Sequence, residues 1–279
     1  TDELYKIDDA MKAGFGWEHG PFQIWDAIGI EKGLEIMKAE GETPAAWVND
    51  MIASGNKSFY TVKNGASYYY DIPKKSAEKI PGQDSFIILD NIRKSKEVFK
   101  NSGVVVEDLG DGILNVEFQS KMNTIGGDVL AGLNKALDIA EKDFQGLVVG
   151  NQAPNFSVGA NIGMIFMMAV EQEYDELNMA IKMFQDTMMR MRYSAIPTVS
   201  IGMAKVSTSA YEAYDLGILQ HGKDIVVVNK DRQIATAKAH AKLMAEAGYT
   251  QPVKRKDIKV LGKQALGMFL VGTDSMEDS

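Results

Sequence analysis

The apolar positions of the first fifty residues recur at the spacing of short amphipathic helices. Pro21 stands where the second helix should begin, and a proline fits there because a first-turn N–H has no intrahelical acceptor. Thr43 precedes the run Pro44–Ala53 as a helix-capping residue would. We therefore predict a small all-helical module over residues 1–58. The apolar face of its first helix consists of Ile7, Ala10, Met11 and Gly14.

A β-hairpin is predicted next, because two runs rich in aromatic and β-branched residues fill Phe59–Asp71. Asn64-Gly65 separates the two runs, and this dipeptide suits the tightest hairpin turn. The following segment, Pro73–Asp84, is polar and contains Pro81-Gly82, which is typical of a linker. Residues 59–84 are thus predicted to form a hairpin and a linker, with a domain boundary near residue 85.

From residue 85 onward, strand and helix patterns alternate. Gly110-Asp-Gly112 separates two strands as a second hairpin turn would. The order β-α-β-α-β that follows predicts right-handed crossovers and a largely parallel sheet. The predicted strands are 104–108, 113–118, 146–150 and 197–202, and the predicted helices run through 129–140 and from about 161 to 191, with a break around 171–175. Beyond Met203 we predict a helix at 209–216, a strand at 224–229 and a helix at 231–248.

One turn, Asn155–Asn161, joins a buried strand to a long helix through Ser157, Gly159 and Ala160. The first N–H groups of such a helix have no intrahelical acceptor, and the helix dipole is positive at the same end. The turn is therefore a candidate anion or oxyanion site. On spacing alone, the alternative is a plain tight turn in which Gly159 only relieves crowding.

Composition excludes several kinds of chemistry. Of the 279 residues, 45% are hydrophobic and 24% are charged, which is typical of a soluble globular protein. The sequence contains no cysteine, so disulfides and thiolate sites are excluded. The net charge of −8 argues against a nucleic-acid surface. No basic-then-apolar leader or membrane-spanning run occurs, and we predict a cytoplasmic protein without a membrane span.

The remaining conspicuous residues favour structural roles. Several of the sixteen methionines cluster at 164–168 and 188–191, where helical spacing favours gap-filling core over an adaptable binding surface. The acidic cluster from Glu171 to Glu176 is interpreted as a solvated face. The three histidines lie far apart, so no metal site and no catalytic triad is predicted. Ser157 lacks the Gly-x-Ser-x-Gly pattern of a hydrolase nucleophile.

Two blocks of the sequence resemble known families. Residues 85–203, with Lys121-Met-Asn123 before a helix and Phe156-Ser-Val-Gly-Ala160 after a strand, resemble the crotonase (enoyl-CoA hydratase/isomerase) superfamily. Residues 7–30, with Gly14-Phe-Gly-Trp-Glu-His-Gly-Pro-Phe22, resemble the C-terminal helical domain of 3-hydroxyacyl-CoA dehydrogenases. A dehydrogenase block that precedes a crotonase block is similar to the bacterial bifunctional enzymes of fatty-acid β-oxidation.

The resemblance implies an α/β, crotonase-like (ClpP/crotonase) spiral fold that follows a small all-α dehydrogenase module. It implies that the backbone N–H of Ala160 is one of two donors to the thioester oxygen of an acyl-CoA substrate, and that Gly159 helps to bind that substrate. By the same resemblance, Met122 and Ile162 would line the groove for coenzyme A, although plain core packing is the alternative for both. Assembly into homo-oligomers is a further expectation from the family.

The chain also departs from the resemblance. After the strand at 197–202 the family has a glycine-rich turn and the catalytic carboxylates, whereas here Met203 leads directly into Ala204-Lys-Val-Ser207. We expect several dozen residues to be missing at this junction, and residues 204–279 to be the C-terminal part of the crotonase-like domain and a helical tail. No Gly-x-Gly-x-x-Gly occurs, so an NAD site is expected only in a dehydrogenase domain outside this chain. The chain is thus expected to be a fragment that carries no cofactor of its own.

Two hypotheses follow. In the first, the chain is part of an enzyme that hydrates 2-enoyl-CoA and carries a linked 3-hydroxyacyl-CoA dehydrogenase activity. In the second, the crotonase-like domain has lost its acids and is a non-catalytic acyl-CoA-binding or oligomerisation scaffold.

Overall fold

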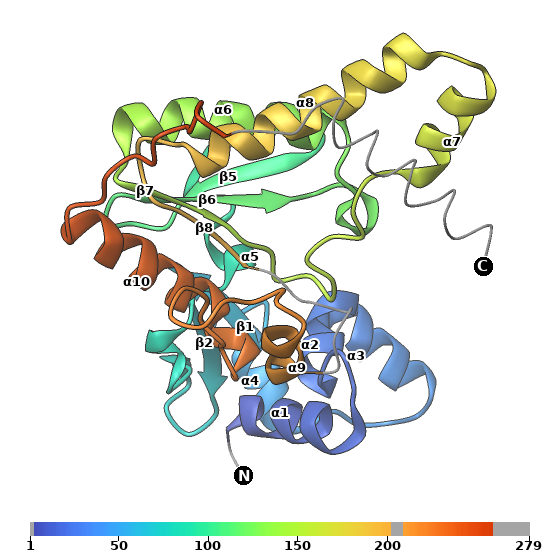
Figure 1. Cartoon of the computed structure of the whole chain (residues 1–279). Helices are drawn as coiled ribbons and strands as arrows, with labels where there is room; N and C mark the ends of the chain where they lie inside the picture. The colour runs from blue at the N-terminus through green and yellow to red at the C-terminus, as the bar shows by residue number, and fades with distance from the viewer. Residues whose placement is uncertain (1–2, 202–208, 259–279) are drawn as a thin grey trace.

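The computed structural model describes residues 3–201 and 209–258. Within these ranges the chain builds two sheets with helices around them, a lower group that includes the N-terminus and an upper group around the larger sheet (Figure 1). The N-terminal helices of the lower group are α1 (Leu4–Phe15), α2 (Pro21–Ile28), α3 (Ile30–Ala39) and α4 (Ala46–Ala53). The lower group also contains the antiparallel sheet β1-β2-β3, with β1 at Tyr60–Lys63, β2 at Ala66–Asp71 and β3 at Ser76–Lys79.

The lower group has an aromatic core that helices and sheet share. Phe59 packs edge-to-face against Phe22 and Trp25, with ring centroids 5.2 Å apart in both pairs. Such pairs add stabilisation beyond the area that they bury. The buried members of this core come from both the helices and residues 59–80 of the sheet: Leu4, Ile30, Val48, Met51, Phe59, Tyr69, Tyr70 and Ile80.

Two carboxylates bind the lower helices to the sheet. Asp8 is buried and accepts hydrogen bonds from the N–H groups of Phe22 (2.9 Å) and Gln23 (3.1 Å), and it thereby caps the start of α2. Its carboxylate also accepts from the Tyr60 hydroxyl at 2.7 Å. Burial and this bond raise the pKa of Tyr60. Asp26 accepts from the N–H groups of Phe59 (2.8 Å) and Tyr60 (2.9 Å).

The upper group is organised around a five-stranded mixed sheet of order β4-β5-β6-β7-β8. Pairs β4-β5 and β5-β6 are antiparallel, whereas β6-β7 and β7-β8 are parallel. Its strands are β4 (Glu97–Lys100), β5 (Val104–Asp108), β6 (Ile113–Phe118), β7 (Gly146–Val149) and β8 (Thr198–Ser200). The helices of this group are α5 (Leu89–Ile92), α6 (Gly127–Asp143), α7 (Ile162–Val170), α8 (Tyr174–Arg192) and α10 (Gln233–Glu246). Helix α9 (Ala210–Asp215) is drawn in the lower part of Figure 1. Single 3₁₀ turns occur at η1 (Gln83–Ser85), η2 (Lys121–Asn123) and η3 (Lys230–Arg232).

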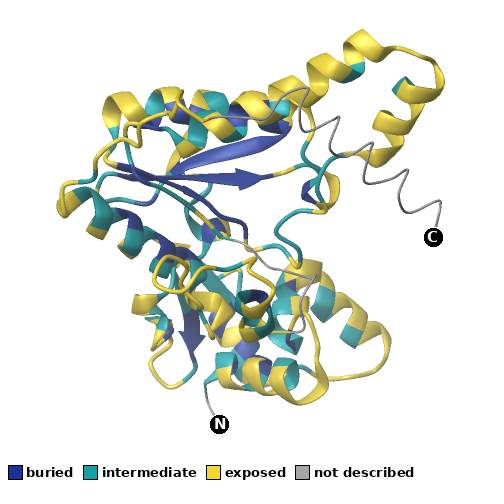
Figure 2. Ribbon diagram, in the orientation of Figure 1, coloured by how far each residue is buried: buried dark blue, intermediate teal, exposed yellow. Residues whose placement is uncertain are grey.

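Helices cover both faces of this sheet (Figures 1 and 2). On one face, α6 and the C-terminal half of α8 pack against Leu114, Val116 and Leu147. On the other face, α10 packs through Ile234, Ala237 and Ala241 against Ile113 and Val148. The alternation of side chains along β6 therefore serves two separate cores. No helix within 3–201 and 209–258 combines the length and the apolar character that crossing a bilayer requires.

Several sequence expectations are confirmed. Pro21 is the first residue of α2, and the turn at Asn64-Gly65 joins β1 to β2. Strands β5 and β6 have the predicted bounds, and α6, β7, α9 and α10 lie at or within a few residues of the predicted positions. The predicted break near residue 171 separates α7 from α8. The parallel part of the sheet is confirmed for β6-β7-β8.

Other expectations are wrong. The linker predicted at 73–84 contains β3, which pairs with β2 along Tyr68–Asp71 although Ser-Ala-Glu-Lys carries little strand preference of its own. Helix α4 begins at Ala46, so Thr43 does not cap it. The strand predicted at 224–229 is a loop in which Val228 is exposed, because this segment pairs with neither sheet. The predicted junction near Met203–Ala204 and the part of the predicted helical tail beyond Ile258 lie outside the described residues.

Candidate functional site

The turn Asn155–Asn161 lies between the end of β7 and the start of α7, as the sequence predicts (Figure 1). Asn161 is the N-cap of α7, and its side chain accepts a hydrogen bond from the N–H of Met164 at 3.2 Å. Gly159 has φ +84°, a conformation that glycine adopts without strain. The turn therefore has a glycine where its backbone requires one, and this requirement is what the sequence signal detected.

A second segment, residues 118–125, holds this turn from the side. The N–H of Ile125 donates to the carbonyl of Gly159 at 2.9 Å. The Asn123 side chain donates to the carbonyl of Asn155 at 2.9 Å, and the Ser157 hydroxyl donates to the carbonyl of Asn123 at 2.6 Å. The two segments are about thirty residues apart in the sequence, so no local pattern could have revealed this contact.

Asn151 connects the turn to the sheet. Its side-chain oxygen accepts from the N–H of Phe118 at 2.6 Å, and its amide nitrogen donates to the carbonyl of Phe156 at 2.8 Å. Asn151 is buried, and its bond to Phe118 is shielded from water. The rings of Phe118 and Phe156 pack with centroids 5.6 Å apart. The position of the turn is thus fixed by both polar and apolar contacts.

Ala160 is the residue for which the sequence predicts an oxyanion donor. Its backbone N–H has no hydrogen-bond acceptor among the described residues, while the carbonyl of the preceding residue is bonded to Ile125. A backbone donor without an acceptor at the surface of a turn can bind an anionic or carbonyl oxygen. No carboxylate in ranges 3–201 and 209–258 is hydrogen-bonded to residues 155–161.

The two residues expected to line a coenzyme A groove flank this turn at the surface. Met122 is 60% exposed and has φ +55°, in the 3₁₀ turn just before α6. Ile162 is 77% exposed and is the first residue of α7. The alternative of plain core packing is therefore wrong for both side chains. Their role in binding coenzyme A stays a prediction.

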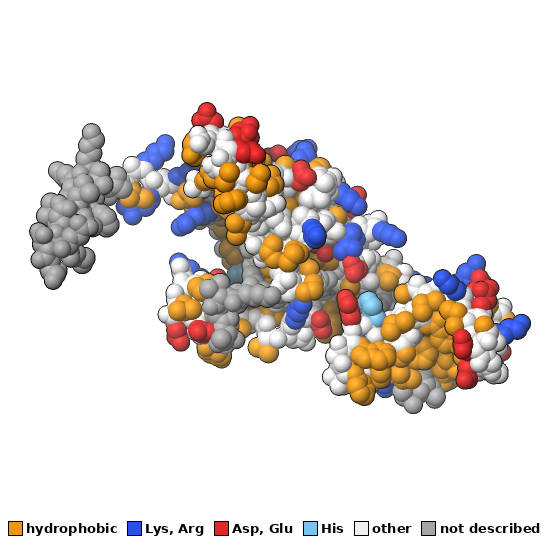
Figure 3. Space-filling model, turned by 90° about the vertical axis from the view of Figure 1, so that its right-hand side faces the viewer, with side chains coloured by type: hydrophobic (Ala, Val, Ile, Leu, Met, Phe, Trp, Pro, Cys, Tyr) orange, Lys and Arg blue, Asp and Glu red, His pale blue; other side chains and the backbone are white. Residues whose placement is uncertain are grey.

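The methionines of α7 and α8 also differ from expectation. The interpretation of the methionines as core is wrong for Met164, Met167 and Met179, which are largely exposed, although Met188 and Met191 do pack on the sheet. Figure 2 shows α7 almost wholly exposed, and Figure 3 shows hydrophobic side chains gathered on that side of the molecule. A groove of about 520 Å³ lies between the two helices, lined by Met164, Met167, Met168 and by Glu171, Glu173 and Glu176.

The acidic residues at this groove lie on a solvated face, as predicted. Glu173 is exposed, and the charge of Glu176 raises its pKa. The described parts of the chain contain no group of three or more acidic, histidine or cysteine side chains that could hold a metal ion. His221 stacks on Tyr214 with ring centroids 4.1 Å apart, which gives it a packing partner.

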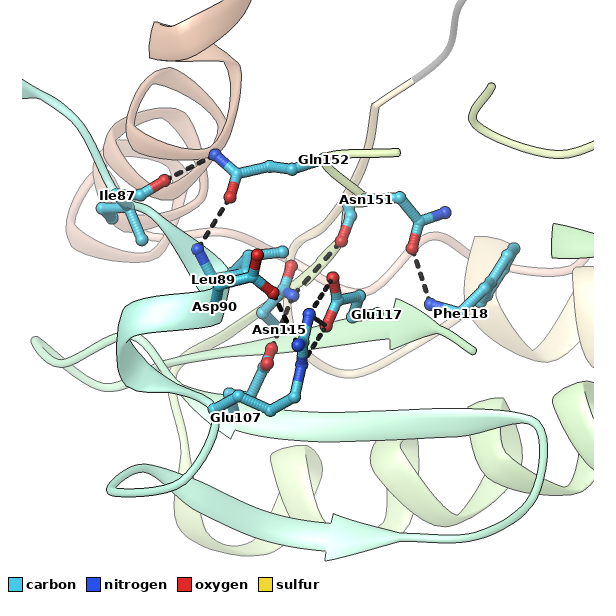
Figure 4. A network of polar contacts seen from close by, with 11 residues as sticks. Ile87, Leu89, Asp90, Glu107, Asn115, Glu117, Phe118, Asn151 and Gln152 are labelled. Carbon is cyan, nitrogen blue, oxygen red and sulfur yellow. Dashed lines mark hydrogen bonds and ion pairs between the residues drawn. The ribbon is translucent and has the colours of Figure 1, made fainter. Parts of the chain in front are cut away.

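A polar cluster that the sequence analysis missed lies on the α10-facing side of the sheet (Figure 4). It consists of Glu107 on β5, Asn115 and Glu117 on β6, and Arg93 after α5. Arg93 donates to both carboxylate oxygens of Glu117 at 2.9–3.1 Å and pairs with Asp90 at 2.6 Å. The Asn115 amide donates to Glu107 at 3.0 Å.

Glu107 is the most unusual member of this cluster. It is completely buried, and burial raises its pKa to about 7. One oxygen of its carboxyl group and the side-chain oxygen of Asn115 are both buried without a hydrogen-bond partner among the described residues. Burial likewise raises the pKa of Glu117, although Arg93 opposes the shift. The alternating polar positions 107, 115 and 117 were the available signal, but such alternation normally indicates a solvent-facing side.

Gln152, next to Asn151, connects this face to the segment that precedes α5. Its side chain accepts from the N–H of Leu89 at 2.7 Å and donates to the carbonyl of Ile87 at 2.7 Å. Asn91 in turn donates to the Ser67 hydroxyl of the smaller sheet at 2.9 Å. Segment 87–93 is thereby bonded to both sheets.

Comparisons with known proteins bear on the two halves of the chain differently. Residues 3–69 match the family model described as the 3-hydroxyacyl-CoA dehydrogenase, C-terminal domain. This match covers α1–α4, β1 and most of β2. The module predicted at 1–58 contains helices α1–α4 and no strand within its described residues, and the matched domain continues beyond it into the sheet.

Longer matches extend over the rest of the chain. A probable 3-hydroxyacyl-CoA dehydrogenase of Bacillus subtilis (strain 168) is 33% identical over 346 residues, covering 99% of this chain and 43% of that protein. A putative fatty acid oxidation complex trifunctional enzyme of Rickettsia felis is 26% identical over 204 residues, covering 72% of this chain and 25% of that protein. This chain therefore spans less than half the length of either relative. The first alignment exceeds the 279 residues of this chain by 67 positions, so at least that many aligned positions are gaps in this chain.

Solved structures overlap with a part of the chain. An enoyl-CoA hydratase/isomerase from Xanthobacter autotrophicus Py2 is 22% identical and covers 36% of this chain and 38% of that chain, with a TM-score of 0.31. An enoyl-CoA hydratase from Shewanella pealeana covers 41% of this chain and 42% of that chain, at 13% identity and a TM-score of 0.34. The predicted α/β class is confirmed by the helices and strands themselves, whereas the crotonase-like spiral fold stays a prediction.

Proposed function

We propose a function in acyl-CoA chemistry for this chain, which belongs to the family of 3-hydroxyacyl-CoA dehydrogenases and fatty acid oxidation complex proteins. The substrate class is acyl-CoA thioesters, and the reaction is the hydration of 2-enoyl-CoA to 3-hydroxyacyl-CoA. An NAD-dependent dehydrogenase activity is linked to it in a domain outside these 279 residues. The observation that carries the proposal is the N–H of Ala160, which has no acceptor among the described residues although hydrogen bonds hold the turn around it.

The chemistry needs a donor of this kind. As water adds to the double bond of an enoyl thioester, negative charge develops on the thioester oxygen. A fixed N–H aimed at that oxygen stabilises the transition state, and the loss of one such donor typically costs about 2.7–4 kcal/mol of barrier. Ala160 supplies one donor. The side chains of Met122 and Ile162, exposed on either side of the turn, supply apolar contacts for the coenzyme A moiety.

A second candidate function is a non-catalytic acyl-CoA-binding or oligomerisation scaffold. Two observations favour it: residues 155–161 bond to no carboxylate in the described parts of the chain, and the alignment with the Bacillus subtilis relative contains at least 67 gap positions in this chain. Hydration by the usual mechanism needs carboxyl groups as general acid and base. For the hydratase proposal, we place the general acid and the general base in the segment expected after Met203.

Three measurements test the proposal in sequence. Calorimetric titration with hexanoyl-CoA, with free coenzyme A as the control, measures whether the acyl thioester itself is recognised. The absence of binding would overturn both candidate functions in their acyl-CoA form. Intact-mass analysis of the natural protein then shows whether its mass is that of this sequence, 30.6 kDa, or larger. A crotonyl-CoA hydration assay separates enzyme from scaffold, since binding without turnover supports the scaffold.

A further inference from the structure

The direction of the Ala160 N–H follows from a hydrogen bond made by the residue before it. The carbonyl of Gly159 and the N–H of Ala160 belong to one planar trans peptide group, so they point in opposite directions. Since the carbonyl accepts from Ile125 at 2.9 Å, the N–H of Ala160 points away from Ile125. The bond to Ile125 also polarises this peptide group, which strengthens its N–H as a donor.

The other side of Gly159 is held by Ser157. The N–H of Gly159 donates to the Ser157 hydroxyl oxygen at 3.0 Å, and that hydroxyl donates to the carbonyl of Asn123 at 2.6 Å. Both polar groups of Gly159 are therefore bonded. This matters because glycine at φ +84° has more backbone freedom than any other residue, and it has no side chain whose packing could restrain it.

Asn123 anchors both bonds. It is buried, it has φ +55°, and its side chain donates to the carbonyl of Asn155 at the start of the turn. Its own carbonyl accepts from Ser157, and Ile125 lies only two residues further along the chain. Segment 123–125 thus contacts the turn at residues 155, 157 and 159.

We propose that Ser157 is a positioning residue that fixes the Ala160 N–H toward a thioester oxygen, with Asn123 as its anchor. This inference rests on the proposed acyl-CoA function. Without the hydroxyl, the N–H of Gly159 loses its acceptor, and among the described residues only the bond from Ile125 to the Gly159 carbonyl still holds this glycine. The backbone angles of Gly159 can then change, which weakens the Ile125 bond and turns the Ala160 N–H out of the site. The hydroxyl does not act as a nucleophile, since its proton is donated to a backbone carbonyl.

Infrared spectroscopy of a bound thioester tests this role. The probe is [1-¹³C]hexanoyl-CoA, whose carbonyl stretch moves to lower frequency when it accepts a hydrogen bond and which has no double bond to hydrate. We expect a downshift in the full chain, loss of most of it in Ser157→Ala, and its restoration in Ser157→Thr, which keeps the hydroxyl. Ser54→Ala is the matched control, because Ser54 also donates to a backbone carbonyl (Met51, 2.7 Å) but lies in the lower group.

A second measurement needs no ligand. In protein labelled with ¹⁵N-alanine, the amide relaxation of Ala160 reports the mobility of its N–H. Ser157→Ala should make this amide markedly more mobile than in the unaltered chain, whereas Ser157→Thr and Ser54→Ala should not. Should Ser157→Ala fail to fold, Ser157→Cys keeps the side-chain volume but donates weakly, and an intermediate downshift and mobility are expected.

The outcomes separate the two proposals. A chain that binds no hexanoyl-CoA overturns the acyl-CoA function and this inference together. A chain that binds it without a downshift keeps acyl-CoA recognition but overturns the role of Ala160 as a donor and this inference. A downshift that survives intact in Ser157→Ala, with an Ala160 amide as rigid as before, overturns the positioning role alone. Loss of the downshift in Ser157→Thr as well would show that the position tolerates no change, which also contradicts a role for the hydroxyl.

Discussion

The two faces of the five-stranded sheet differ although the same strands build both. The face under α6 is apolar, with Val106, Leu114 and Val116 against Leu133 and Leu137. The face toward α10 carries Glu107, Asn115 and Glu117 between its apolar residues. The apolar face stabilises the fold because it buries apolar side chains. The polar face determines which segments pack against it, because Arg93 bonds to Glu117 and Gln152 bonds to Leu89. The contrast predicts that the two faces respond differently to mutation and to pH.

The largest effect should come from the apolar face. Leu137→Ala removes a fully buried side chain from the contact between α6 and the sheet and leaves a cavity. We expect the free energy of unfolding to fall by about 4 kcal/mol, within the usual range for such changes. Urea unfolding followed by circular dichroism measures it, with Lys135→Ala on the same helix as the surface control. A loss below about 1 kcal/mol would show that this core does not stabilise the sheet.

Arg93→Met should have the next largest effect. The change removes the cation that pairs bidentately with Glu117 and leaves a carboxylate that is only 8% exposed without a counter-charge. Breaking a buried pair in this way typically costs 3–5 kcal/mol, and we expect about 3 because the Arg93 side chain is itself 31% exposed. The double variant Arg93→Met/Glu117→Met, measured in the same urea series, should recover most of the loss. Equal stability of the single and double variants would contradict a role for the unpaired charge.

Glu107 should make the polar face sensitive to pH. Its folded-state pKa is about 7, above the ordinary 4.5, so the folded state binds its proton more tightly than the unfolded state does. Stability from this group is therefore full below about pH 4.5 and is lost as the pH rises through 7, by roughly 3 kcal/mol. A proton on Glu107 also supplies a donor to the neighbouring carboxylate of Glu117.

Glu107→Gln tests this explanation, because its amide supplies a permanent donor and cannot titrate. The variant should match the unaltered protein near pH 5, exceed it near pH 8, and show a smaller slope of unfolding free energy against pH. Part of the slope of unfolding free energy against pH should remain, because Glu117, whose pKa is also raised, faces the same cluster beside Arg93. The exposed Glu35→Gln is the control. An unchanged slope in Glu107→Gln would show that another group carries the pH dependence.

The same contrast explains what the sequence could predict. Local signals identified the Asn64-Gly65 turn, α6 and the Gly159 turn, because each depends on residues within one turn or one helix. Strand β3 was missed because its pairing with β2, and not its composition, makes it a strand. The role of the alternating residues Glu107, Asn115 and Glu117 was missed because helices cover a face that the pattern marks as solvent-facing.

Gln152→Ala should have the smallest effect and should distinguish docking from stability. Its side chain makes two bonds to segment 87–93, but it is exposed, so water can satisfy the groups that it leaves. We expect a loss of about 1 kcal/mol in unfolding free energy and a larger change in local opening. Amide hydrogen exchange at Leu89 should accelerate at least tenfold, while exchange in α6 stays unchanged, with Gln145→Ala as the control. If exchange at Leu89 and in α6 accelerated together, the two faces would open as one unit, and the polar face would have no separate role in docking.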